Sequence, residues 1–165
     1  MNDFLKDVKL ARKGDSQAFA RLYAIVYKDM YHIALYSLRN SHDACDAVSD
    51  AVLDAFTSIG NLNDEKAFKS WIFRILSAKI KQRQAEYYKD TEELNENTSV
   101  EDFNYENAEL SQALENLDPQ SRLILSMSVL EGYTSEEISE VCNLKSGSVR
   151  SKLKRIKERL KLELT

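Results

Sequence analysis

The chain has 165 residues, a formal net charge of −4 and two cysteines. This length suits one domain or two small ones, and no apolar run is long enough to span a membrane. The N-terminus lacks a cationic start followed by an apolar core, which excludes a typical secretory signal, so we expect a cytoplasmic protein without membrane insertion. Cys45 and Cys142 have no Cys or His at metal-ligand spacing, so we expect two small buried residues and no metal site.

Helical periodicity in the first 86 residues predicts four helices that form a small bundle with its own core. Turn and capping residues mark the expected helix ends: Gly14, then Asp15 or Ser16, Ser41, Gly60, and Asn63 or Asp64. Apolar residues recur at spacings of three and four in each helix, and we expect Phe56 of the third helix and Trp71 of the fourth to face inward. One proline, four glycines and no clear period-two runs favour an all-α chain.

The third predicted helix carries an acidic ridge, formed by Asp43, Asp46, Asp50 and Asp54 at spacings of three and four. One interpretation is a solvated face, because charge runs are usually solvated and acidic residues are favoured near a helix N-terminus. The other is a docking strip for a basic partner. A dinuclear metal site needs Glu-x-x-His pairs from two helices, and only Asp29 and His32 come close, so we expect none.

The fourth predicted helix is basic and contains the only tryptophan; its cations are Lys66, Lys69, Arg74, Lys79, Lys81 and Arg83. Cations that follow a phosphate backbone beside an aromatic ring are typical of nucleic-acid binding. Trp71 itself lies on the apolar stripe, so we interpret it as a core residue. The short polar loop from Gly60 to Glu65 is either a connector or the rim of a pocket for an unstacked base.

The middle of the chain is strongly acidic. Residues 86–115 contain ten acidic residues and one basic residue, Lys89, so this stretch carries −9 while the remainder carries +5. Few apolar residues occur from 87 to about 100, and we expect a flexible linker there. A helix is predicted from Phe103 to Leu117, and Asp118-Pro119 begins another, with Pro in its first turn.

Residues 134–164 have the pattern of a helix-turn-helix. Thr134 and Glu137 form a predicted capping box, and Asn143 can adopt the left-handed conformation that ends a helix. Ser146 is the expected cap of a second helix. This second helix has one apolar stripe, Val149, Leu153, Ile156 and Leu160, and a basic opposite side.

Two interpretations of this pair of helices are open: a plain amphipathic pair with a solvated cationic face, or a DNA reader whose second helix enters the major groove. Gly147 and Ser148 favour the second interpretation, because small residues at a helix N-terminus let backbone approach phosphate. In that arrangement Ser148, Ser151 and Lys152 lie where the first turns meet base edges.

Four motifs in order resemble the extracytoplasmic-function type of sigma factor, a promoter-recognition subunit of bacterial RNA polymerase. These are Gly-Asp-Ser-Gln-Ala-Phe at 14–19, the Asp-rich segment 43–52, Phe-Lys-Ser-Trp-Ile-Phe-Arg-Ile at 68–75, and the C-terminal run from Leu-Asp-Pro-Gln-Ser-Arg at 117–122 through the helix-turn-helix. The resemblance implies two small helical domains joined by a flexible acidic linker. We therefore predict a region-2-like domain at 1–86, a linker at 87–104 and a region-4-like domain at 105–165.

The resemblance also implies partners and residues. Core polymerase would bind through its beta-prime clamp helices and beta flap, and the clamp would meet Asp43, Asp46, Ser49 and Asp50. The promoter minus-ten element would contact Asn61, Asn63, Asp64, Lys69, Trp71, Arg74, Lys79 and Arg83. The minus-thirty-five element would contact Ser148, Arg150, Ser151, Lys152, Lys154 and Arg155. An anti-sigma factor is a further expected partner, and no catalytic residue, cofactor or enzyme activity is implied.

The sequence departs from the family pattern at three positions. Ser49 stands where Gln is usual, Ala78 where Asn is usual and Gln82 where Asp is usual, so we expect an unusual minus-ten preference. Two alternatives stay open: a stand-alone helix-turn-helix regulator, which predicts a dimer and palindromic sites, and a degenerate sigma-like interaction protein. An enzyme is the least favoured interpretation, because the sequence shows neither a nucleophile with a base partner nor a glycine loop that could cradle a phosphate.

Overall fold

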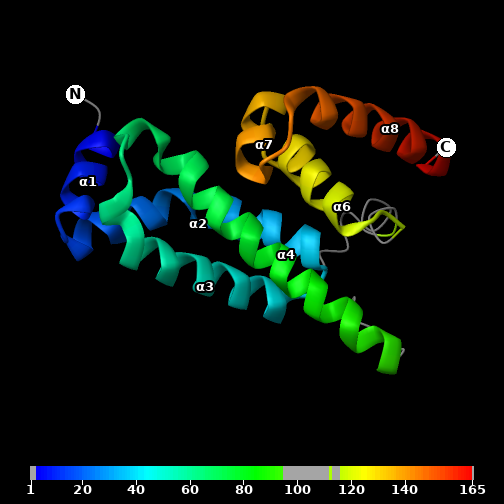
Figure 1. Ribbon diagram of the computed structural model, residues 1–165, viewed down its shortest axis with the longest axis horizontal. Coiled ribbons are helices and arrows are strands. Elements are labelled where there is room, and N and C mark those ends of the chain that lie inside the picture. Colours follow the sequence, from blue (N-terminus) through cyan, green and yellow to red (C-terminus); the bar gives the residue numbers. More distant parts are fainter. Residues whose placement is uncertain (1–2, 95–111, 113–115, 165) are drawn as a thin grey trace.

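The computed structural model describes residues 3–94, 112 and 116–164, and within these residues it contains helices and turns but no strand (Figure 1). The α-helices are α1 (Asp3–Arg12), α2 (Ser16–Leu38), α3 (Ser41–Ser58), α4 (Phe68–Leu94), α6 (Pro119–Leu125), α7 (Ser135–Cys142) and α8 (Ser146–Leu164). Short 3-10 turns, η1 (Ile59–Asn61) and η2 (Glu65–Ala67), connect α3 to α4, and a π-helical turn, η5 (Ser126–Leu130), follows α6. None of the described helices is long and apolar enough to cross a bilayer.

Helices α1 to α4 form the N-terminal body, whose local hydrogen bonds explain most of its helix ends. The carboxylate of Asp15 accepts from the backbone N–H groups of Gln17 and Ala18 and so caps α2. The cap of α3 was predicted to be Ser41 but is Asn40, whose side chain accepts from the Asp43 N–H. Arg39 ends α2 in the left-handed conformation, with φ of 60°, so the chain reverses between α2 and α3 within two residues.

The core of the N-terminal body is made by the predicted apolar stripes of α2, α3 and α4. Large side chains are fully buried there: Leu22, Met30, Ile33, Phe68, Ile72, Leu76 and Ile80. Two predictions were wrong. Phe56 is 46% exposed, because it packs edge-on against Phe19 at the rim of the bundle, and Cys45 is exposed whereas Cys142 is buried.

The C-terminal body consists of α6, η5, α7 and α8. Leu123, Ile124 and Met127 are buried as predicted, whereas most of the helix predicted at 103–117 lies outside the described residues. The capping box of Thr134 and Glu137 and the left-handed Asn143 are both confirmed. Ser146 is the first residue of α8 rather than its cap, since the Val149 N–H donates to the carbonyl oxygen of Lys145.

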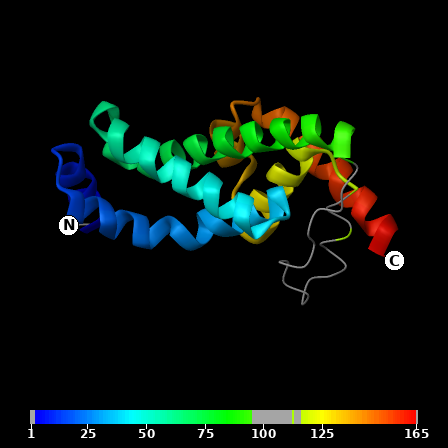
Figure 2. The same ribbon diagram turned by 90° about the horizontal axis from the view of Figure 1, so that it is seen from below.

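The two bodies pack directly against each other (Figures 1 and 2), and one continuous apolar core runs through both. The rings of Phe73 on α4 and Tyr133 before α7 meet edge to face at 5.5 Å. Polar groups also cross this contact: the Gln84 amide donates to the carbonyl oxygens of Ser37 and Pro119, and Arg122 Nε donates to the Ser37 carbonyl at 3.1 Å. The two helical bodies expected from the sequence are therefore joined by a buried interface (the interbody contact).

Helix α4 continues to Leu94, eight residues beyond the predicted domain boundary at 86. Its last two turns fall in the stretch that was predicted to be a flexible linker at 87–104, and the remainder of that stretch lies outside the described residues. The linker's flexibility and the domain boundaries stay predictions.

The capping box gives a test of how α7 is held. Substitution Thr134→Ala removes the oxygen that accepts from the Glu137 N–H at 3.1 Å, so we expect the free energy of unfolding to fall by about 1 kcal/mol. Thr134→Ser keeps this oxygen, so it should change the free energy of unfolding by only about a few tenths of a kcal/mol. Urea unfolding followed by circular dichroism measures both, and equal stability of the two variants would contradict the assigned cap.

Candidate nucleic-acid interface

The basic side of α8 is exposed because its apolar stripe is buried. Val149, Leu153, Ile156 and Leu160 pack inward, which leaves the cations of the helix on its outer surface and flanks. Of the residues predicted to contact the minus-thirty-five element, Ser148, Arg150, Ser151, Lys154 and Arg155 are exposed and Lys152 is half-buried. The first turns of α8 are therefore accessible to a duplex.

The cations of α8 lie on two flanks with different surroundings. On one flank Arg150 faces Glu136 of α7, with Nη1 and Oε1 3.3 Å apart. On the other, three cations line a hollow of about 220 Å³ between α8 and the start of α6, whose lining is Leu117, Asp118, Ser121, Lys152, Arg155, Ile156 and Arg159. The predicted DNA contacts thus lie on two flanks of α8: the flank of Arg150, and the flank of Lys152 and Arg155, which borders the hollow.

Among the described residues that line the hollow, one is a carboxylate, Asp118, whose charge opposes an anion. Burial acts to raise the pKa of Asp118, but hydrogen bonds from Ser121 and the charge of Lys152 outweigh it and hold this pKa below the ordinary value. The carboxylate oxygens accept from both the Ser121 N–H and its hydroxyl. Asp118 is therefore an ionised helix cap for α6 and keeps the hollow from being uniformly cationic.

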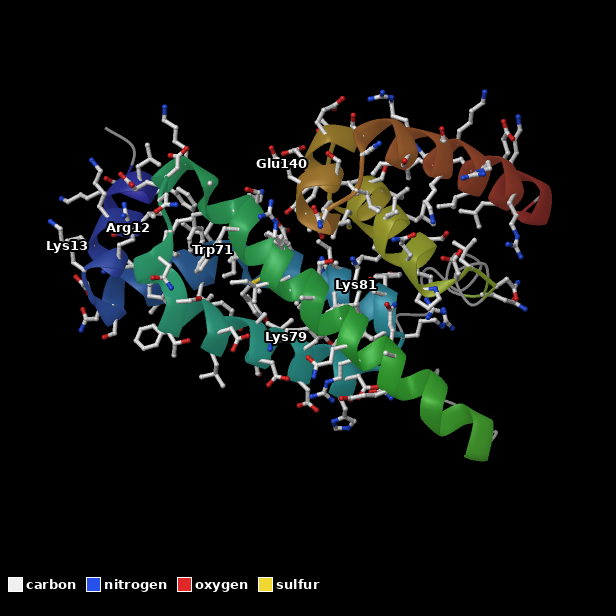
Figure 3. All side chains as sticks on the ribbon, in the orientation of Figure 1. Arg12, Lys13, Trp71, Lys79, Lys81 and Glu140 are labelled. Carbon is white, nitrogen blue, oxygen red and sulfur yellow. The ribbon has the colours of Figure 1, made fainter. Side chains whose placement is uncertain are left out.

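Helix α4 carries its cations on two sides (Figure 3). Four of them, Lys69, Arg74, Lys79 and Arg83, were predicted to contact the minus-ten element, and Lys81 is a further cation of the same helix. Arg74 Nε donates to the Glu140 carbonyl oxygen of α7 at 3.0 Å, and Lys81 Nζ to the Cys142 carbonyl oxygen at 3.5 Å. The ammonium of Lys69 lies 5.5 Å from the centre of the Tyr133 ring. The side of α4 with Lys69, Arg74 and Lys81 (the α7-facing side) is thus occupied by the C-terminal body.

The other two predicted minus-ten cations face the acidic ridge of α3. Arg83 lies 3.8, 3.4 and 3.5 Å from carboxylate oxygens of Asp43, Asp46 and Asp50, and Lys79 lies 2.8 Å from Asp54. Figure 3 shows Lys79 and Lys81 on opposite sides of α4, with Lys79 on the side of α3. The ridge is therefore partly neutralised within the chain, while Asp46 stays 59% exposed and Ser49 is exposed.

The loop before α4 presents its polar side chains to solvent. Asn61, Asn63 and Asp64 are exposed, whereas Leu62 between them is buried and anchors the loop. Asp64 also accepts from the Lys66 N–H at 3.0 Å and so begins η2. Trp71 is half-buried, with its ring 5.9 Å from that of Phe68, which agrees with a core role for most of its surface.

Sequence reasoning did not find the groups that join the bodies. Phe73 lies off the predicted apolar stripe of α4, and no contact was predicted for Glu131 or Tyr133. Their one signal was the presence of two large aromatic side chains, Phe73 and Tyr133, outside the predicted apolar stripes. Within the described residues, no group of three or more His, Cys, Asp or Glu side chains is placed to hold a metal.

The geometry defines a two-part helical protein with a DNA-binding helix-turn-helix in its second part. Residues 22–86 match the family profile of sigma-70 region 2, and residues 107–160 match that of sigma-70 region 4. The chain belongs to the sigma-70 family as an extracytoplasmic-function type sigma factor, the class of subunit that gives RNA polymerase its promoter recognition and starts transcription. Such proteins are initiation factors rather than catalysts.

Curated relatives resemble the chain over nearly its full length. It is 26% identical to the ECF RNA polymerase sigma factor SigW of Bacillus subtilis, covering 96% of this chain and 95% of that protein. It is 28% identical to the ECF RNA polymerase sigma-E factor of Haemophilus influenzae, covering 92% and 89%. The match to region 2 does not favour a stand-alone helix-turn-helix regulator.

Solved structures share the fold. CnrH, in complex with the cytosolic domain of CnrY, superposes with a TM-score of 0.79 at 20% identity, covering 99% of this chain and 97% of that chain. RpoE from Bartonella quintana, in complex with the anti-sigma factor NepR, gives a TM-score of 0.74 at 17% identity, covering 88% and 96%. At these identities the likeness shows the all-α, two-body fold alone.

Lys154 lies one helical turn after Arg150, on the same flank of α8, and gives a test of DNA contact. Substitution Lys154→Ala removes one exposed cation, so the slope of log affinity against log salt should fall by about one unit if Lys154 contacts a phosphate. Fluorescence anisotropy on a 30-base-pair duplex between 50 and 200 mM salt measures this slope. The matched control is Lys13→Ala, which removes an exposed cation at the far end of the N-terminal body and should leave the slope unchanged (Figure 3). If the slope is also unchanged for Lys154→Ala, Lys154 is not part of the DNA interface.

Proposed function

We propose that α3 docks the chain on the clamp helices of core polymerase, that the 61–64 loop and α4 engage the minus-ten element, and that α8 reads the minus-thirty-five element. The observation that carries this assignment is the match of regions 2 and 4 to the two helical bodies, in order, with the acidic ridge on the first and the helix-turn-helix on the second. The beta flap would contact the C-terminal body. The protein would act in the cytoplasm, where polymerase works.

The exposed apolar side chains of α3 support the docking surface. Leu53 is 64% exposed and Phe56 46% exposed, beside the partly neutralised ridge. Large apolar groups rimmed by charge are typical of protein-binding surfaces. The charges of the ridge would orient the chain and speed its association with the partner, while the exposed apolar side chains would supply the area that is buried on binding.

An anti-sigma factor is the second proposed partner. One of the structural neighbours is a sigma factor in complex with an anti-sigma factor, and the same α3 surface has the exposed apolar area that such a partner needs. The minus-ten specificity would differ from the family pattern, since Ala78 and Gln82 are both exposed on α4 and lack the usual Asn and Asp groups.

Run-off transcription tests the function directly. Purified core polymerase, supplemented with this chain, should start transcripts at defined sites in a pool of genomic fragments, and the start sites give the promoter sequence. Core polymerase alone and core polymerase with an Asp46→Arg variant are the controls. A complete lack of defined starts with the wild-type chain would contradict the proposal.

Charge reversal on the ridge tests the docking surface. Asp50→Arg should weaken binding to core polymerase at least tenfold, because it places a cation against a basic partner and beside Arg83. Asp7→Arg is the matched control, since it also reverses one charge and breaks one ion pair, at 2.8 Å to Arg21, but lies on α1, outside the proposed contact. Pull-down titration at 150 mM salt measures both, and equal affinities of the two variants would reject the assignment.

A further inference from the structure

A pair of carboxyl groups lies in the interbody contact. Glu131, directly after η5, has a side chain that is only 8% exposed, and it shares a hydrogen bond with the carboxyl group of Asp29 on α2. Two carboxyl groups can share a hydrogen bond only when one of them carries a proton. The closed arrangement of the two bodies therefore favours a proton at this position.

Other charged groups face the pair from each neighbouring element. His32 on α2 has Nδ1 3.5 Å from Glu131 Oε1, Lys69 on α4 is the nearby cation, and Glu137 on α7 adds a further negative charge near Tyr133. Burial, followed by the hydrogen bond and charge of Asp29, raises the pKa of Glu131 to about 8, and Lys69 opposes this only partly.

Tyr133 connects the pair to the remainder of the contact. Its hydroxyl is buried and makes no hydrogen bond within the described residues, and burial followed by the charges of Asp29 and Glu131 raises its pKa well above the ordinary value. Its N–H donates to the Met127 carbonyl oxygen at 3.0 Å, and its ring packs on Phe73. Segment 131–133 thus supplies one carboxyl group of the pair and the aromatic ring of the contact within three residues.

We propose that Asp29 and Glu131 form a proton-dependent latch between the two bodies, and that loss of the shared proton releases the C-terminal body from α2 and α4. Release exposes the α7-facing side of α4, because Arg74 and Lys81 donate to carbonyl oxygens of α7 only while the bodies are packed. The latch goes beyond promoter recognition, and its test below needs neither polymerase nor DNA.

The direction of the pH dependence follows from the two states. In the open chain Glu131 has its ordinary pKa of 4.5, and in the closed chain the value is about 8. Closure is therefore most favourable below pH 4.5, weakens up to tenfold per pH unit between these values, and levels off above pH 8. A proton on His32 would attract a Glu131 carboxylate, so it acts in the same direction.

The native Cys142 reports on opening. Cys142 is 3% exposed and its thiol lies beside Ser77 and Lys81 of α4, so a thiol reagent reaches it when α7 leaves α4. A Cys45→Ser background removes the exposed second thiol. Labelling rates of the full chain are measured from pH 6 to pH 8.5 by mass spectrometry, with circular dichroism at each pH to verify that the helices persist.

The comparison is made at each pH with Glu131→Gln, which keeps the shape of the side chain and donates a permanent hydrogen bond to Asp29. The ratio of wild-type to variant rates cancels the titration of the thiol itself. We expect this ratio to rise about tenfold or more from pH 6 to pH 8, because the raised pKa of Glu131 makes closure weaken as the pH rises. Asp3→Asn, an exposed carboxyl at the far end of the N-terminal body, is the matched control and should label like wild type at every pH.

Two results would overturn the latch. One is a wild-type to Glu131→Gln ratio that stays flat across this range, and the other is a radius of gyration, measured by X-ray scattering, that does not increase for the wild type from pH 6 to pH 8.5. If Glu131→Gln does not fold, Asp29→Asn takes its place, since it removes the second negative charge while keeping a donor. The same flat ratio would then overturn the latch.

Discussion

The packing of α4 against both bodies is the constraint on which the rest of the structure depends. One side of this helix buries Phe68, Ile72, Leu76 and Ile80 in the N-terminal bundle, and Phe73 turns toward the C-terminal body. A helix that is apolar on two sides has to be covered on two sides. The cations of α4 lie between these apolar surfaces, so the packing that stabilises the closed chain also determines which of them reach solvent.

The charges of the chain are arranged so that opposite signs face each other at short range. The acidic ridge of α3 meets Lys79 and Arg83, and carbonyl oxygens of α7 meet Arg74 and Lys81. Such partly exposed pairs contribute little stability each, so a polymerase or a DNA duplex that offers more charge can replace them. The chain therefore holds its binding groups in weak internal contacts rather than leaving them unpaired.

Local signals predicted the helices of this protein well, and their failures were local too. The capping box at Thr134 and the left-handed Asn143 were found because they depend on residues within one turn. The caps at Ser41 and Ser146 were each wrong by one residue, since Asn40 and Lys145 compete for the same role. Phe56 and Cys45 were expected inside, but a helical stripe does not say where the edge of a bundle lies.

By itself the sequence determined the all-α class, the two helical bodies, the ridge on α3 and the helix-turn-helix, because each depends on residue spacing along one helix or on one short motif. Only the tertiary structure decided that the bodies share a core, that the cations of α4 divide between α3 and α7, and that Asp29 meets Glu131. These features join residues from 25 positions apart (Asp54 and Lys79) to 102 positions apart (Asp29 and Glu131). Their contact follows from how helices stack, which no periodicity within a single helix encodes.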